Sequence, residues 1–140
     1  MNAVRPQKRK RERMGLRAEP QWRSQRQLKH VRAHCCLLEG KPGHVCEGII
    51  EAMHKRTETD GAKDVKPSDY WTCPGCSGAH REQHQIGEGP FEKKWGVSMG
   101  QWCEAMQKTS PLAGEIREHR SAHPVAYDRA ATGGRISNHF

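Results

Sequence analysis

The sequence predicts one small α+β domain braced by zinc, with a basic arm before it and a tail after it. Two observations support this prediction. Five of the six cysteines fall between Cys35 and His84, and this segment ends in a CxxC followed by two histidines four residues apart. Hydrophobic residues make up 34% of the 140 positions, which is little for a packed core. Domains this small with so little apolar material usually depend on a metal or disulfides.

The same sequence indicates the cellular compartment in which the protein works. No apolar run is long enough to span a membrane, and no apolar segment follows the basic N-terminus as in a signal peptide. We therefore expect no membrane partner, a cytoplasmic location and reduced cysteines. In a reducing compartment, clustered cysteines and histidines indicate zinc more than disulfides.

Positive charge is concentrated at the N-terminus. The formal charge of the chain is +8, but residues 1–34 carry 11 Lys/Arg against 2 acidic residues, whereas the remainder has a net charge of −1. Such an arm suits nucleic-acid phosphates, and the alternative is a solvated tail that only aids solubility. We expect residues 1–23 to be a flexible arm in which Arg9 and Arg11 contact nucleic acid.

The domain itself is expected over residues 24–109. It should begin with a weak amphipathic helix over residues 24–34, capped by Ser24 and presenting Arg26, Lys29 and Arg32 outward, with Arg32 expected to contact nucleic acid. A loop rich in glycine and proline follows and ends at Cys46.

The centre of the domain reads as strand, loop, strand and helix. Residues 49–56 alternate as a strand does, and residues 70–73 return as a second short strand after a polar loop of about a dozen residues. A helix is expected to begin near Ser77 as its N-cap. Two short helices over residues 91–95 and 97–106 should supply core aromatic side chains and a buried Cys103.

Residues 110–140 are expected to form a partly helical, mostly disordered tail. Its three histidines, His119, His123 and His139, are expected to be exposed and unrelated to function.

The cysteines are expected to hold a structural zinc ion. Cys73 and Cys76 have the spacing of a zinc knuckle, and Cys46 lies across a loop from the adjacent pair Cys35 and Cys36. Adjacent cysteines do not easily bind one ion together. We therefore expect one member of that pair to join the other three cysteines.

The histidines suggest a second, catalytic metal. Hydrolysis of a phosphodiester needs a base to activate water and an ion to offset developing charge. His54 on the strand is the candidate base. His80 and His84 share a helical face and are candidate ligands for Mg²⁺, Mn²⁺ or Zn²⁺. The alternatives are that His54 is a surface histidine and that the helical pair completes a single structural zinc site.

These residues carry a resemblance to a known family. The block from His30 to Gly96 resembles HNH (ββα-metal, or His-Me finger) endonucleases of phages and prophages, which are related to Ref-like recombination nucleases. The words that carry it are EAMHKRTETDGAKDVKPSDYW, CSGAHREQHQIGE and FEKKWG. The resemblance implies a ββα-metal core with a zinc knuckle and extra C-terminal helices. It also implies a phage-encoded DNA endonuclease acting in the cytoplasm of a bacterial host.

The family pattern also implies roles for individual residues. It makes His54 the general base, His80 and His84 the ligands of the catalytic ion, and Asp69 the residue that orients the loop. It matches Cys76 with the knuckle cysteine, and Cys46 together with Cys35 or Cys36 with the earlier pair of zinc ligands.

Two positions depart from the family pattern, and two cations flank the candidate base. Ala79 replaces the first histidine of a usual pair, and Met53 stands where many members have a metal ligand. Lys55 and Arg56, next to His54, are expected to contact phosphate. The alternative function, from a different class, is a zinc-stabilised nucleic-acid-binding module that does not cleave.

Overall fold

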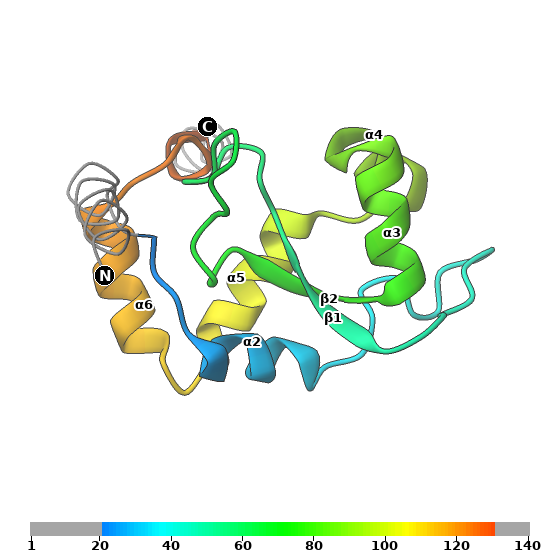
Figure 1. The fold of residues 1–140 in the computed structure, drawn as a ribbon, viewed down its shortest axis with the longest axis horizontal. Helices are drawn as coiled ribbons and strands as arrows, with labels where there is room; N and C mark the ends of the chain where they lie inside the picture. Colours follow the sequence, from blue (N-terminus) through cyan, green and yellow to red (C-terminus); the bar gives the residue numbers. More distant parts are fainter. Residues whose placement is uncertain (1–20, 131–140) are drawn as a thin grey trace, which may run out of the picture.

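The computed structural model describes residues 21–130, which form a two-stranded antiparallel sheet with helices packed around it (Figure 1). The arm with Arg9 and Arg11, and His139 at the other end, lie outside these residues. The strands are β1 (Ile50–His54) and β2 (Thr72–Cys76). The helices are α2 (Gln25–Arg32), α3 (Ser77–Ile86), α4 (Glu88–Trp95), α5 (Met99–Lys108) and α6 (Ala113–Ala122).

The sheet is a short hairpin in which Ile50 lies opposite Cys76 and His54 lies opposite Thr72. The sequence predicts both strands, but β2 runs three residues further than expected, through Pro74 and Gly75. Proline is tolerated because each strand of a two-stranded sheet is an edge strand. Glycine is required next to it, because a Cβ at this position would collide with the Met53 sulfur.

Helix α3 follows β2 without a loop. Its N-cap is Cys76, whose sulfur accepts a hydrogen bond from the Ala79 N–H, so the expected cap at Ser77 is one residue too late. Helix α2 begins as predicted, because the Ser24 hydroxyl accepts a hydrogen bond from the Gln27 N–H at 3.1 Å. In Figure 1, α2 runs along one side of the sheet, and α3 and α4 lie together at one end.

The core is built mainly from β2, α4 and α5. Phe91, Met99 and Cys103 are fully buried against Tyr70 and Trp71 from the segment that leads into β2. The expected core aromatics Trp95 and Trp102 are partly buried at its border. The prediction of a buried Cys103 is confirmed.

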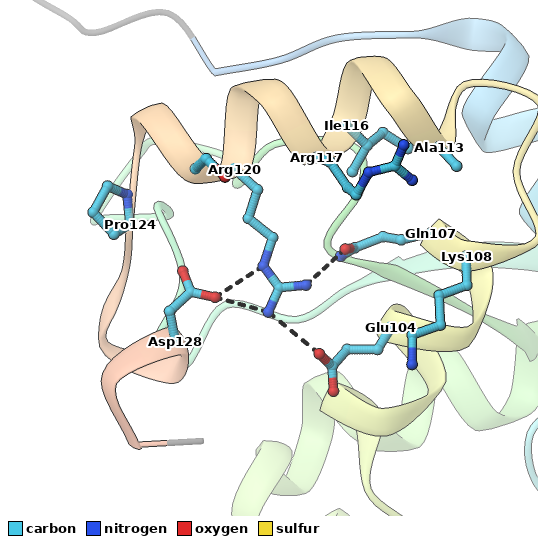
Figure 2. Close-up of a pocket in the computed structure, with 10 residues that line it drawn as sticks. Glu104, Gln107, Lys108, Ala113, Ile116, Arg117, Arg120, Pro124 and Asp128 are labelled. Carbon is cyan, nitrogen blue, oxygen red and sulfur yellow. Dashed lines mark hydrogen bonds and ion pairs between the residues drawn. The ribbon is translucent and has the colours of Figure 1, made fainter. Parts of the chain in front are cut away.

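Residues 110–130 are more ordered than the sequence suggests. Helix α6 buries Ile116, and its Arg120 bonds Asp128, Gln107 and Glu104 (Figure 2). The Arg120 guanidinium also lies 4.6 Å from the Trp71 ring centre. These contacts fasten the end of the described chain to α5, so the packed body extends past the expected boundary.

The histidines of this segment are also not simply exposed, because the ring Nδ1 of His119 is 2.9 Å from the Tyr70 hydroxyl. No helix in the described part is long and apolar enough to cross a membrane.

Candidate metal centre and histidine site

Four side chains converge beside the start of α3. Cys36, His44, Cys46 and Cys76 each offer one ligand atom, and these atoms all lie within 4.8 Å of one another. The His44 Nε2 is 3.4 Å from the Cys46 sulfur, 3.7 Å from the Cys76 sulfur and 3.8 Å from the Cys36 sulfur. Two loops and a helix N-terminus therefore supply one Cys₃His set.

These spacings fit a tetrahedral zinc ion. Zn–S bonds of about 2.3 Å and Zn–N bonds of about 2.05 Å at tetrahedral angles place sulfur and nitrogen about 3.6 Å apart. The three measured spacings bracket that value. Three thiolates and one imidazole are also the soft donors that zinc prefers. The residues present therefore fit zinc, as the sequence predicts for a metal in this region.

The backbone supports the sulfur atoms. The N–H groups of Leu38 and Cys76 donate to the Cys36 sulfur at 3.4 and 3.3 Å, and the Ala79 N–H donates to the Cys76 sulfur at 3.4 Å. Such bonds stabilise thiolates and orient them.

The pKa values of two of these thiols shift in opposite directions. Desolvation of the thiol, together with the neighbouring thiols of Cys36 and Cys76, raises the pKa of Cys46 to about 12. Burial also acts to raise the pKa of Cys76, but backbone N–H groups and the neighbouring thiols outweigh it and lower the pKa. Packed thiols of this kind gain from a divalent cation that neutralises them.

Two of the predicted zinc ligands lie outside this group. Cys35 is not among the four converging side chains, so Cys36 is the member of the adjacent pair that contributes. Cys73 is buried, and its sulfur lies 3.8 Å from the Met53 carbonyl oxygen. The physical reason is the period of two in a strand: Cys73 and Cys76 are three positions apart in β2 and point to opposite faces.

His44, which the sequence analysis did not select, takes the fourth ligand position. Its signal is present in the sequence, because it lies two residues before Cys46 in a loop with Gly40 and Gly43. Both glycines have positive φ, of 83° and 84°, a conformation that favours glycine and that folds this loop back on itself.

His54 is paired with Asp69. Its Nε2 lies 3.0 Å from the Asp69 Oδ1, and its side chain is 15% exposed. Asp69 also accepts from the Arg23 guanidinium at 3.1 Å and from the Ser24 N–H at 2.9 Å. Burial acts to raise the pKa of Asp69, but His54, the Ser24 N–H and Arg23 outweigh it and lower the pKa. The ionised carboxylate fixes the imidazole with Nε2–H as donor and leaves Nδ1 as a proton acceptor.

His80 and His84 meet at their Nε2 atoms, which are 3.1 Å apart. Glu51 of β1 lies 2.7 Å from the Nδ1 of His80 and holds that ring in the tautomer whose Nε2 carries a lone pair. The hydrogen bond from His80 lowers the pKa of Glu51, and the Ser77 hydroxyl lowers it further. A carboxylate behind a histidine is the arrangement that orients many metal ligands.

Two other pairs with the same spacing in the described chain serve as internal comparisons. The Nδ1 of His34, which follows the end of α2, donates to the His30 carbonyl at 2.8 Å, and the Nδ1 of His123, the C-cap of α6, donates to the His119 carbonyl at 2.9 Å. The His30 Nε2 lies 3.0 Å from the Thr109 hydroxyl, and no described hydrogen bond joins it to the His34 Nε2. A spacing of four residues alone therefore does not produce the arrangement of His80 and His84. In tetrahedral zinc sites, nitrogens of two histidine ligands lie about 3.3 Å apart.

His54 does not converge with the helical pair on one point. Within residues 21–130, no hydrogen bond or ring contact joins His54 to His80 or His84, and these three do not form a group of the kind seen at the cysteines. His54 and Glu51 are three positions apart in β1 and point to opposite faces. Met53 between them is fully buried and offers no ligand at the surface.

The two cations expected to contact phosphate have other partners. Lys55 is buried, and its ammonium donates to the Thr57 carbonyl at 2.8 Å. Arg56 is exposed, but its guanidinium donates to the Ala62 carbonyl at 2.8 Å and holds the long loop closed. Both side chains therefore stabilise the structure around β1, and their contact with phosphate stays a prediction.

Comparison with known proteins adds no identification. No protein-family model, curated protein or solved structure matches this chain.

Proposed function

We propose that this protein is a zinc-braced, metal-dependent nuclease that hydrolyses phosphodiester bonds in DNA. The observation that carries the proposal is the chain Glu51–His80–His84, in which a carboxylate orients one imidazole and the two Nε2 atoms meet. Two imidazoles and a nearby carboxylate favour Zn²⁺ or another transition-metal ion over Mg²⁺. A divalent ion bound there would offset negative charge on the phosphate and on the leaving oxygen.

The protein groups supply the remaining parts of the reaction. The Nδ1 of His54 accepts a proton from the attacking water, and Asp69 stabilises the imidazolium that results. The N–H of Ser24 and the guanidinium of Arg23 keep Asp69 ionised and in place. The proposal requires the scissile phosphate to lie across the β1 edge, with His54 on one side and His80 and His84 on the other.

Plasmid nicking tests this function. Purified full-length protein is incubated with supercoiled plasmid and Zn²⁺, Mn²⁺ or Mg²⁺, and parallel reactions contain chelator. We expect metal-dependent nicking that falls by about 10²- to 10⁴-fold in His54→Ala, because a general base contributes that much. Asp69→Asn is expected to lower the rate as well, since the amide cannot stabilise the imidazolium.

The matched control is His34→Ala, which removes a half-buried histidine that bonds a backbone carbonyl. It should nick at the rate of the parent protein. If His54→Ala also nicks at that rate, the assignment of the base is wrong.

A second candidate is a zinc-stabilised module that binds nucleic acid without cutting it. The buried Met53 and the separation of His54 from the α3 histidines favour this alternative. Tight DNA binding without nicking in any of the metals would support it over the nuclease.

A further inference from the structure

Positive charge on the described body is concentrated at α2. Residues 21–34 contain four basic and no acidic residues, whereas residues 35–130 contain 12 Lys/Arg and 14 Asp/Glu, a net charge of −2. Arg23 is bound to Asp69, which leaves Arg26, Lys29 and Arg32. All three are exposed, and no side-chain hydrogen bond or ion pair joins them to another described residue.

The helix places these three cations in one row. Gln27 and Val31 form the buried seam of α2. At about 100° per residue, Lys29 lies directly opposite that seam, and Arg26 and Arg32 lie about 60° to either side. The inner face is anchored, because Gln27 bonds Ser110 and the His30 Nε2 lies 3.0 Å from the Thr109 hydroxyl. The row is therefore presented on a rigid element.

The length of the row fits a nucleic-acid strand. Arg26 and Arg32 are about 9 Å apart along the axis at about 1.5 Å per residue. One strand of duplex DNA carries a phosphate about every 3.4 Å along its axis, so the row spans about three phosphates. The row also begins two residues after Ser24, whose N–H holds Asp69 beside His54.

We propose that the outward face of α2 (Arg26, Lys29 and Arg32) is the phosphate-docking surface of the protein for duplex DNA. This inference rests on the proposed function, because it says which face holds the strand that His54 would act on. These three cations differ from Lys55 and Arg56, whose charged groups donate to carbonyls within the fold. α2 then has two roles: its N-terminus fixes the His54–Asp69 pair, and its outer face holds the backbone of the substrate.

The salt dependence of DNA binding tests this surface. The affinity of the zinc-loaded full chain for a fluorescein-labelled duplex is measured by anisotropy between about 50 and 200 mM salt, with no further divalent ion added so that the structural zinc is kept. The variant is Arg26→Gln/Lys29→Gln/Arg32→Gln. Each lost phosphate contact reduces the slope of log K against log salt by about 0.9, so the slope should fall by about 2.7.

The control is Lys93→Gln/Arg117→Gln/Arg129→Gln, which removes the same charge from three exposed cations on other elements. Its slope should match that of the parent protein, and both variants should keep the parent melting temperature because all six side chains are exposed. Equal slopes for the two variants would overturn the proposal.

The failure of this inference is distinguishable from failure of the nuclease. If the α2 variant loses the slope while the parent protein never nicks plasmid, the docking surface stands and the nuclease falls. If the parent nicks and the α2 variant binds with the parent slope, the docking surface alone is wrong.

Discussion

Replacing Cys46 by serine should remove zinc and destabilise the fold, whereas Cys35→Ser should do neither. Both cysteines are exposed, so the loss of buried surface contributes little to either variant. They differ in geometry: the Cys46 sulfur is 3.4 Å from the His44 Nε2, within the Cys₃His group, and Cys35 lies outside it. A comparison of Cys46→Ser with Cys35→Ser therefore separates the effect of losing the metal from the other effects of losing a thiol.

The expected magnitude follows from the stability that zinc supplies. Structural zinc contributes about 10–16 kcal/mol in small zinc-dependent domains, which is comparable to the whole stability of a domain of this size, about 5–15 kcal/mol. Loss of the ion in Cys46→Ser should therefore abolish the cooperative melting transition, whereas a neutral surface change such as Cys35→Ser moves the melting temperature by about 2 °C at most. Zinc is measured by mass spectrometry of the gel-filtered protein, and melting by circular dichroism. Zinc retained in Cys46→Ser, or lost in Cys35→Ser, would refute the assignment.

Three further predictions concern the fold. Burial, followed by nearby carboxylates, raises the pKa of both Tyr70 and Tyr127, the two tyrosines of the chain, to about 12. Their neutral forms therefore stabilise the fold fully below the unfolded pKa of about 10, and this contribution is lost as the pH rises toward 12. The absorbance of the native protein at 295 nm should therefore show no phenolate at pH 10. A half-titrated signal at that pH would contradict the burial of both rings. Gly75→Ala should lower the free energy of unfolding in urea by about 1–3 kcal/mol, because the new methyl group displaces the Met53 sulfur. Gly89→Ala, whose methyl group would meet no atom within 4 Å, should not lower it. Equal effects of the two substitutions would exclude the collision. Arg120→Lys should make the chain after residue 122 sensitive to limited proteolysis, because a lysine cannot bond Asp128, Gln107 and Glu104 together. An unchanged digestion pattern would contradict this role of Arg120.

Local patterns in the sequence predict the central elements well. The alternation of residues 49–56 identifies β1, and Ser24 identifies the start of α2, because both depend on neighbouring residues only. The same patterns predict a zinc site with Cys46, Cys76 and one of Cys35 and Cys36. They do not separate Cys73 from Cys76, because that distinction depends on β2 continuing through Pro74 and Gly75, an edge-strand geometry that propensities disfavour.

Long-range contacts explain the remaining differences. The partner of His54 is Asp69, fifteen residues away, and the carboxylate is fixed by the N-terminus of α2, which no local pattern reveals. Lys55 reads as an exposed strand cation, but the Thr57 carbonyl and the ring of Tyr127 enclose it. The order of α6 likewise depends on Arg120, which bonds α5 and the end of the described chain.

The most direct measurement of the central proposal is the number of divalent ions bound per chain when His80 and His84 are removed. Zinc-loaded protein is titrated with Zn²⁺ by calorimetry, as the parent, as His80→Ala/His84→Ala and as the spacing-matched control His30→Ala/His34→Ala. The account predicts one further ion in the parent and in the control, and none in His80→Ala/His84→Ala. A further ion that still binds after the loss of His80 and His84, or a parent that takes up none, would contradict it.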